Sequence, residues 1–174
     1  MTFAVAALLV ALDQATKAWA SATFAAGGGG MPLGLGFTLT YVRNTGAAFG
    51  MLRGVEVSVF GVTLDGTLLL ALASLAVAVW LSVYLLRRGP ELPALTRASL
   101  GLVLAGATGN MIDRFRLRYV VDFVHFEVGW FDFPVFNLAD ALIVVGATLL
   151  VLVAWLGPDP ERDARRTPRD DAGS

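Results

Sequence analysis

The sequence predicts a mainly α-helical membrane protein: a bundle of four transmembrane helices with a small β-structure on its outer side. Composition is the first reason, because hydrophobic residues make up 56% and charged residues 16% of the 174 residues, and the mean hydropathy is +0.70. The second reason is that four windows hold about 20 mainly apolar residues each, enough for a helix to cross the roughly 30 Å apolar core of a bilayer. We expect one membrane-embedded domain, residues 1–158, and a disordered cytoplasmic tail, residues 159–174, which has too few apolar residues to fold.

The four windows are Met1 to Phe24, Thr67 to Leu86, about Ala94 to Ile112 and about Phe136 to Leu156. The segments Arg87-Arg88-Gly89-Pro90 and Gly157-Pro158, which follow the second and fourth windows, are typical of helix ends. The first window has no basic segment at its start, and Asp13 and Lys17 stand where a cleavage site would follow the apolar stretch. We therefore expect a retained first helix and not a cleaved signal peptide.

Four helices put both termini on one side of the membrane, together with the short connection 87–97. That side carries seven arginines and the opposite side five, a bias that favours cytoplasmic termini. Residues 25–66 and 113–135 are then the outer connections. In the first, Gly36–Val42 and Val55–Phe60 alternate as strands do, and the second is rich in aromatic residues, which favour the level of the lipid headgroups. We expect a small sheet or cradle that rests on the outer leaflet.

Composition excludes several classes of function. The net charge of −1 and the lack of a basic motif argue against a nucleic-acid partner. The absence of cysteine excludes disulfides, thiol catalysis and cysteine-bound metal. The one histidine, His125, is flanked by Val124 and Phe126, and we interpret it as a packing or interfacial residue; with Asp122 and Glu127 it makes only a weak metal set. We expect no metal and no cofactor.

The residues that can carry chemistry are acids in apolar surroundings. Asp140 stands near the start of the fourth window, with Asn137 three residues before it, and an ionisable residue in such a run marks a functional site by default. Asp122 lies inside an apolar quartet of the second outer connection, and Asp113 follows the third window. Two carboxylates at a dry interface cannot both ionise easily, so one keeps a proton, as aspartic peptide hydrolysis requires. Spacing alone leaves Asp113 and Asp122 equal as partners of Asp140, whereas a turn role explains Asp132.

Four further polar residues and one glycine have a structural and a functional interpretation. Asp13 and Lys17 are four residues apart on one helix face, where they form either a structural ion pair or part of a catalytic group. Lys17 and Ser21 have the same spacing, but nothing else around Ser21 supports a Ser-Lys nucleophile. Asn44 and Gly46 fit an Asn-x-Gly turn, and the alternative is that Asn44 holds a substrate backbone or an oxyanion.

Small residues line one face of the third window. Gly101, Ala105 and Gly109 recur every fourth residue, a spacing that lets another helix approach closely. Asn110 and Asp113 are three residues apart and are neighbours at the outer end of the same helix. Together these features predict a polar site beside a tight helix contact.

The polar motifs form five segments: Asp13-Gln14-Ala15-Thr16-Lys17, Asn44-Thr45-Gly46-Ala47-Ala48-Phe49, Gly109-Asn110-Met111-Ile112-Asp113-Arg114, Val121-Asp122-Phe123 and Phe136-Asn137-Leu138-Ala139-Asp140. With these segments in this order, the chain closely resembles the bacterial lipoprotein signal peptidases, also called signal peptidase II. The resemblance implies an aspartic endopeptidase of the inner membrane. It would remove signal peptides from prolipoproteins by cleaving on the amino side of the diacylglyceryl-modified cysteine.

The resemblance also implies which residues act. The two catalytic aspartates would be Asp122 and Asp140, which breaks the tie that spacing leaves. The matching positions around the site, for substrate binding or support, are Asn44, Gly46, Asn110, Asp113, Arg114, Asn137, Asp13 and Lys17. The implied fold has four transmembrane helices, a small extracytoplasmic β-cradle and a short helix that lies on the membrane. The implied partners are a lipid-modified prolipoprotein, membrane lipid and the cyclic peptide antibiotic globomycin.

Two other functions compete with this interpretation. A small transporter or channel would use Asp13, Asp113 and Asp140 as an intramembrane proton or cation path. Such a path needs polar residues through the depth of several helices, whereas here the second window is nearly featureless and the acids cluster toward the outer ends. A non-catalytic assembly factor is the other option, and it would survive the loss of either aspartate.

Overall fold

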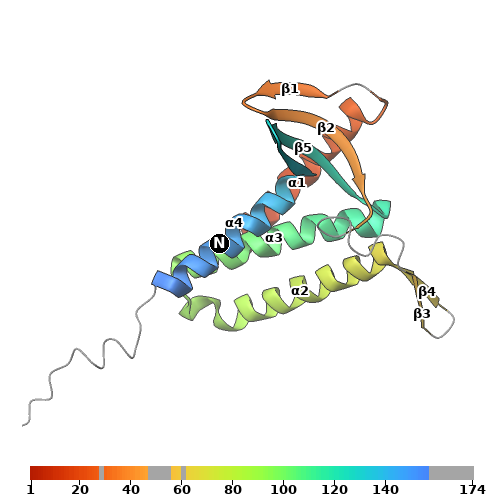
Figure 1. Ribbon diagram of the computed structural model, residues 1–174. Helices are drawn as coiled ribbons and strands as arrows, with labels where there is room; N and C mark the ends of the chain where they lie inside the picture. Colours follow the sequence, from red (N-terminus) through yellow and green to blue (C-terminus); the bar gives the residue numbers. More distant parts are fainter. Residues whose placement is uncertain (28–29, 47–55, 60–61, 157–174) are drawn as a thin grey trace, which may run out of the picture.

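The computed structural model of the chain describes residues 1–27, 30–46, 56–59 and 62–156 (Figure 1). Its helices are α1 (Thr2–Phe24), α2 (Gly66–Arg88), α3 (Ala94–Leu117) and α4 (Leu138–Leu156), with a 3-10 turn, η2 (Gly89–Glu91), between α2 and α3. Its strands are β1 (Met31–Gly34), β2 (Phe37–Asn44), β3 (Glu56–Val59), β4 (Val62–Asp65), β5 (Val120–Val128) and β6 (Phe131–Phe136). The expected tail, residues 159–174, lies outside the described residues.

The helices coincide with the four apolar windows, except at the end of α3. The sequence predicts an end near Ile112, but α3 continues to Leu117, so the connection that follows begins at Arg118 and not at Asp113. The basic residues in its last turn interact favourably with the helix dipole. Arg118, with a φ of 65°, then ends the helix in the left-handed conformation. Asp113 is therefore a helical residue and not a loop residue.

Among the described residues, three helices are long and apolar enough to cross a membrane: α1, α2 with η2, and α4. The composition of α3 differs because α1, α2 and α4 all pack against it (Figure 1). An enclosed helix needs no continuous apolar surface toward lipid, and the buried faces of α3 carry glycine, alanine and polar residues. The described parts of the connections 25–66 and 118–137 contain strands and turns, without the short helix that the resemblance implies.

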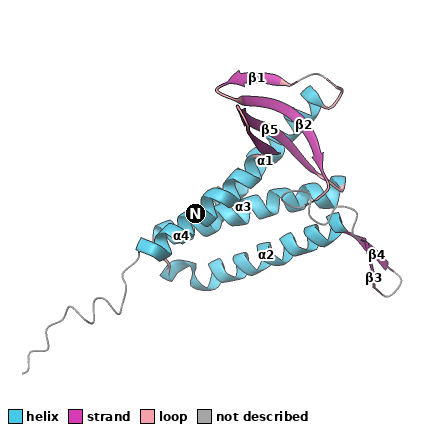
Figure 2. Cartoon of the chain, in the orientation of Figure 1, coloured by secondary structure: helices cyan, strands magenta, loops and turns pink. Residues whose placement is uncertain are grey.

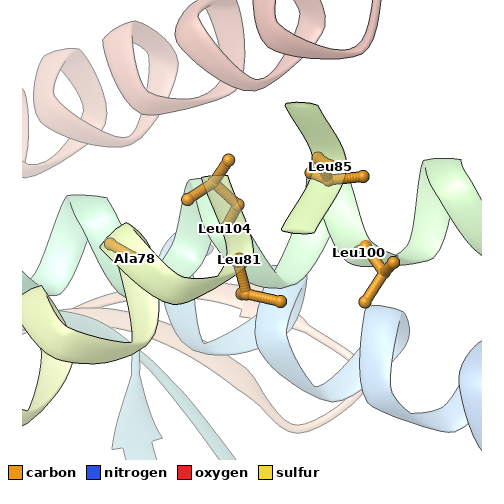
Figure 3. Close-up of a cluster of buried hydrophobic side chains, with 5 residues drawn as sticks. All are labelled: Ala78, Leu81, Leu85, Leu100 and Leu104. Carbon is orange, nitrogen blue, oxygen red and sulfur yellow. The ribbon is translucent and has the colours of Figure 1, made fainter. Parts of the chain in front are cut away.

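Apolar side chains hold α2 against α3. The cluster consists of Ala78, Leu81, Leu85, Leu100 and Leu104 (Figure 3). Within a bilayer such a contact depends on close packing, because lipid tails are as apolar as the leucines.

The small-residue face of α3 contacts α1, as the spacing predicts. Gly101, Ala105 and Gly109 all lie against α1. A Cβ atom at Gly109 would stand 2.5 Å from Asp13 Oδ2, so only glycine fits there. This close approach brings Asp13 and Lys17 next to the polar end of α3.

A four-stranded antiparallel sheet in the order β1-β2-β5-β6 lies at the end of the bundle where α1 ends (Figure 2). Hairpin β3–β4 is separate and lies next to the start of α2. β2 and β3 confirm the two strands predicted from alternation, and the other four strands were not predicted. Phe123 of β5 packs against Ala20 and Phe24, which fastens the sheet to α1.

The register of β2 and β5 positions two polar side chains. Val42 lies opposite Asp122, and Asn44 lies opposite Val120. Side chains two residues apart on a strand share a face, so Asn44 and Asp122 are diagonal neighbours on one side of the sheet.

Candidate active site

Asp140 lies in the first turn of α4, and Asn137 caps that helix. Asn137 Oδ1 accepts a hydrogen bond from Asp140 N at 3.0 Å, and Asp140 Oδ2 accepts one from Asn137 N at 3.2 Å. Such a reciprocal pair satisfies N–H groups that a helix start leaves free. The other carboxylate oxygen, Asp140 Oδ1, accepts from Asn110 Nδ2 of α3 at 2.7 Å. Asp140 is therefore held at the junction of α4 and α3.

Asp122 comes from the sheet and is almost completely buried, with 1% of its surface exposed. Its Oδ2 accepts a hydrogen bond from Asn44 Nδ2 at 2.9 Å, and its Oδ1 accepts one from Asn137 Nδ2 at 2.6 Å. The first bond follows from the register of β2 and β5. The second joins the sheet to the start of α4.

Asn137 links the two carboxylates. Its backbone nitrogen binds Asp140, and its side-chain amide binds Asp122 and also donates to Asn110 Oδ1 at 3.2 Å. With Asn44, three asparagines surround the two acids. Each amide is neutral and can both donate and accept, so it does not force both carboxylates to ionise.

Burial raises the pKa of Asp122 to about 6 from its ordinary value of 3.8, and the negative charge of Asp140 adds to the effect. Burial acts in this direction because it penalises the charged form of a carboxylate. Hydrogen bonds from Asn44 and Asn137 and the positive charge of Lys17 oppose the rise without cancelling it. Two acids in this setting can share one proton, the state that carboxylate pairs need for acid–base catalysis.

Asp113 stands beside these two acids with partners of its own. Its Oδ2 accepts from Val121 N at 3.1 Å and pairs with Lys17 Nζ at 3.1 Å. Its Oδ1 accepts from Gln14 Nε2 at 3.0 Å. These donors compensate the charge of a carboxylate that is only 3% exposed. Among the described residues, the hydrogen-bond donors to Asp140 are instead Asn110 and the backbone of Asn137.

Asp13 and Lys17 form the expected ion pair, with Lys17 Nζ 2.9 Å from Asp13 Oδ2, and both side chains are buried. Nζ also contacts Asn110 Oδ1 at 2.9 Å, in addition to Asp113. An ammonium group has three hydrogens, and these three acceptors use them. Lys17 is thus engaged, and the alternative Ser-Lys pair with Ser21 is not formed.

Asn44 makes the Asn-x-Gly turn that the sequence allows and also binds Asp122, while its contact with a substrate backbone or an oxyanion stays a prediction. Its Oδ1 accepts from Gly46 N at 3.0 Å, which makes the turn, while its Nδ2 binds Asp122. Arg114 Nη2 donates to Gly46 O at 3.3 Å, and its buried Nε finds no hydrogen-bond acceptor among the described residues. Thr67 Oγ1 donates to Thr45 O at 2.9 Å and fixes the same loop to α2. The next residues of this motif, 47–49, lie outside the described part of the chain.

Gln14 is a residue of this cluster that the sequence analysis did not single out. Its Nε2 lies within 3.2 Å of Asp113 Oδ1, Asp13 Oδ2 and the carbonyl oxygen of Gly109. The sequence could have indicated this role, because Gln14 follows Asp13 directly in an otherwise apolar helix.

His125 and Asp132 correct another expectation. His125 Nε2 lies 2.7 Å from Asp132 Oδ1, across hairpin β5–β6. Asp132 is therefore a strand residue with a partner and not a turn residue. His125 has a polar partner and is 26% exposed, and its interfacial role stays a prediction. The sequence could not indicate this pair because it depends on the register of a hairpin that was not predicted. The pair lies outside the acid cluster.

Three comparisons relate the chain to known proteins. Residues 5–156 match the family described as Signal peptidase (SPase) II. The chain is 37% identical over 157 residues to a lipoprotein signal peptidase of Nitratidesulfovibrio vulgaris (strain DP4), with 90% of each protein covered. It is 39% identical over 158 residues to one of Syntrophomonas wolfei subsp. wolfei (strain DSM 2245B / Goettingen), with 90% of this chain and 95% of the relative covered. A bacterial membrane enzyme solved by the in meso method at 2.3 Å resolution has a similar fold, with a TM-score of 0.71, 26% identity and coverage of 99% of this chain and 94% of that one.

Proposed function

The chain belongs to the signal peptidase II family and, as an aspartic peptidase, removes signal peptides from prolipoproteins, and we propose that Asp122 and Asp140 are its catalytic pair. The observation that carries the proposal is the link through Asn137, whose backbone and amide each bind one of the two carboxylates. Burial also raises the pKa of Asp122 to about 6, so a shared proton is available up to about that pH.

In the proposed mechanism, the nucleophile is a water molecule between the two carboxylates. The ionised carboxylate takes a proton from this water as the water oxygen attacks the scissile carbonyl carbon. The protonated carboxyl donates a hydrogen bond to the developing oxyanion. The pair now holds two protons. One of them passes to the leaving amine as the C–N bond breaks, and the other stays on the pair for the next cycle.

The proposed cleavage position is the amino side of a diacylglyceryl-modified cysteine. The signal helix of the substrate would lie against the helical bundle, with its acyl chains in the outer leaflet. Relative to water, burial of the acyl chains in the bilayer contributes about 0.8 kcal/mol per CH₂ group, which keeps the substrate in the membrane beside the site. Membrane lipid would then contact the site and the substrate as well as surround the helices.

We further propose that all four helices of this multi-pass membrane protein span the bacterial inner membrane, in one domain formed by residues 1–158, with both termini in the cytoplasm. The support for α3 as a fourth span is its enclosure by the three apolar helices. The arginine bias of seven to five supports the orientation. The site would then lie at the level of the outer leaflet, where a cyclic peptide inhibitor such as globomycin could reach it.

The test compares three aspartates in one assay, the cleavage of a lipidated precursor by purified protein in detergent. Asp122→Asn and Asp140→Asn should each lower kcat by at least about 10³-fold, because each removes a group that transfers protons. Asp113→Asn should cost much less, because an amide can still accept from Val121 N. Wild-type cleavage by either of the first two variants would contradict the pair.

The transporter interpretation is not favoured by the family match. The acids are also gathered in one hydrogen-bonded cluster, where the first turn of α4 meets the C-terminal part of α3 and the middle of α1, instead of being spread along a path. Flux measurements in proteoliposomes, made beside the cleavage assay, separate the two functions.

A further inference from the structure

Lys17 is the only lysine in the sequence, and the other twelve basic residues are arginines. Its side chain is 3% exposed, and Nζ lies 2.9 Å from Asp13 Oδ2, 2.9 Å from Asn110 Oδ1 and 3.1 Å from Asp113 Oδ2. An ammonium group directs three hydrogens to three acceptors around one atom, whereas a guanidinium is planar and forked. A chain that uses arginine elsewhere therefore has its single lysine where that shape is required.

Two of these acceptors, Asp13 and Asn110, hold Asp140, the member of the proposed catalytic pair that lies on α4. The second oxygen of Asp13 accepts a hydrogen bond from Ala139 N at 2.9 Å, and Ala139 is the residue just before Asp140. Asn110 reaches Asp140 directly, with its Nδ2 2.7 Å from Asp140 Oδ1. Lys17 thus acts on α4 through one backbone bond and one side-chain bond.

The third acceptor, Asp113, holds Asp122, the member of the pair that lies on β5, in the same way. Asp113 Oδ2, which pairs with Lys17, accepts a hydrogen bond from Val121 N at 3.1 Å, and Val121 is the residue just before Asp122. In both halves, a carboxylate bound to Lys17 holds the backbone N–H of the residue that precedes the aspartate. The ammonium is the point where these two supports meet.

We propose that Lys17 is a positioning residue of the peptidase, which sets the relative position of Asp122 and Asp140 by joining their two backbone supports. The inference rests on the proposed catalytic pair. Because Lys17 acts through Asp13, Asn110 and Asp113, it supports the reacting carboxylates without touching them.

Lys17 has a second effect, through its charge. The positive charge lowers the pKa of Asp122, against the larger effects of burial and of Asp140. The other groups that face Asp122 are the amides of Asn44 and Asn137 and, from α3, the guanidinium of Arg114. Removing the ammonium therefore raises the pKa of Asp122, and a change in geometry alone does not.

The test separates shape from charge with two substitutions of Lys17. Lys17→Arg keeps the charge and loses the three-way geometry, so kcat should fall about 10²-fold while the pH at which activity declines stays unchanged. Lys17→Met loses both, so kcat should fall at least as far and the decline should move to higher pH. KM should change little in either variant. Arg88→Gln, which removes an exposed cation from the end of α2, is the matched control and should behave as wild type.

Lys17→Met leaves Asp13 and Asp113 buried with one counter-charge fewer, so its folding must be checked by thermal unfolding. In the double variant Asp13→Asn, Lys17→Met, the local charge stays at its native value and an acceptor for Ala139 N remains. It should fold and show the same loss of kcat, while the pH of the decline should stay near that of the wild type, because the lost carboxylate offsets the lost ammonium. A wild-type kcat in Lys17→Arg and in the double variant would overturn the positioning role.

A spectroscopic measurement on the intact protein does not depend on any Lys17 variant. Labelling with ε-¹⁵N-lysine gives a single side-chain signal, because the chain has one lysine. We expect slow hydrogen exchange at Nζ and a signal that shifts as the acid pair titrates, with no such shift in Asp122→Asn. Rapid exchange, or a signal that does not respond to pH, would contradict the inference. Active Asp122→Asn or Asp140→Asn protein would instead refute the catalytic pair, so the two failures are distinguishable.

Discussion

Asn137 and Asp140 cap the start of α4 for each other: each accepts, through a side-chain oxygen, a hydrogen bond from the backbone nitrogen of the other. A proposed catalytic carboxylate is therefore also part of a helix cap. The same asparagine binds Asp122 through its amide, so one residue carries a structural and a chemical task that substitutions can separate.

Replacing Asn137 separates the cap from the amide. Asn137→Ala loses both, so the free energy of unfolding should fall by about 1 kcal/mol and kcat by about 10²-fold. Asn137→Ser keeps a capping oxygen but has no amide for Asp122, so stability should return without activity. Thermal unfolding in detergent and cleavage kinetics measure the two effects. Recovery of activity in the serine variant would mean that the amide link to Asp122 is not needed.

The pH dependence of kcat/KM should show a decline as the pH rises through about 6. The pKa of Asp122 is raised to about 6, so this acid keeps its proton up to that pH and loses it above, and a pair without a shared proton cannot supply the acid. Asn44→Ala removes a hydrogen bond that favours the ionised form, so the decline should move to higher pH. Activity that is flat between pH 5 and about 8, or a shift to lower pH in Asn44→Ala, would contradict the assignment.

The same pKa has a consequence for stability. A carboxyl whose pKa is higher in the folded state than in the unfolded chain binds its proton more tightly when folded. Its contribution to stability is therefore fully present below its ordinary pKa of 3.8 and is lost as the pH rises through about 6. Asp122→Asn removes this dependence, so the variant should unfold with a flatter pH profile over that interval.

Gly109→Ala should damage the contact between α1 and α3. The new methyl group would lie 2.5 Å from Asp13 Oδ2 and 3.3 Å from Ala139 Cβ, and such overpacking costs about 1–3 kcal/mol. Thermal unfolding measures the effect, and a stability equal to that of the wild type would show that the close approach at Gly109 is not limiting.

The proposed orientation can be tested with cysteines, since the chain has none of its own. Trp130→Cys, at a position that is 94% exposed on hairpin β5–β6, should react with a membrane-impermeant maleimide added outside intact spheroplasts. Arg88→Cys, at the exposed end of α2, should react only after the membrane is opened. The reverse pattern would place the site on the cytoplasmic side.

The local parts of the fold were predictable from the sequence. Apolar length predicted the helices, and the spacing of Gly101, Ala105 and Gly109 predicted the close contact of α3, which the structure makes with α1. Alternation predicted β2 because apolar and polar residue types alternate from Phe37 to Tyr41. The end of α3 was not predicted, because charged residues interrupted the apolar window although the helix continues through them.

Strand pairing was not predictable, and the site depends on it. Asn44 and Asp122 are 78 residues apart in the chain, and they meet only through the register of β2 and β5. A shift of that register by one residue would turn Asp122 to the opposite face. Spacing alone therefore could not choose between Asp113 and Asp122, since the choice lies in a contact between distant segments.

The two acids joined by Asn137 stand on different kinds of structure, one on a strand of the sheet and one at the start of a helix long and apolar enough to cross a membrane. Their neighbourhood also needs Asp13 and Lys17 from α1, so it draws on the chain from its first helix to its last. A partly synthesised or half-inserted chain lacks at least one of these parts. With the proposed pair as its catalytic site, we expect the peptidase to be inert until it is fully assembled, so that its activity would measure complete insertion.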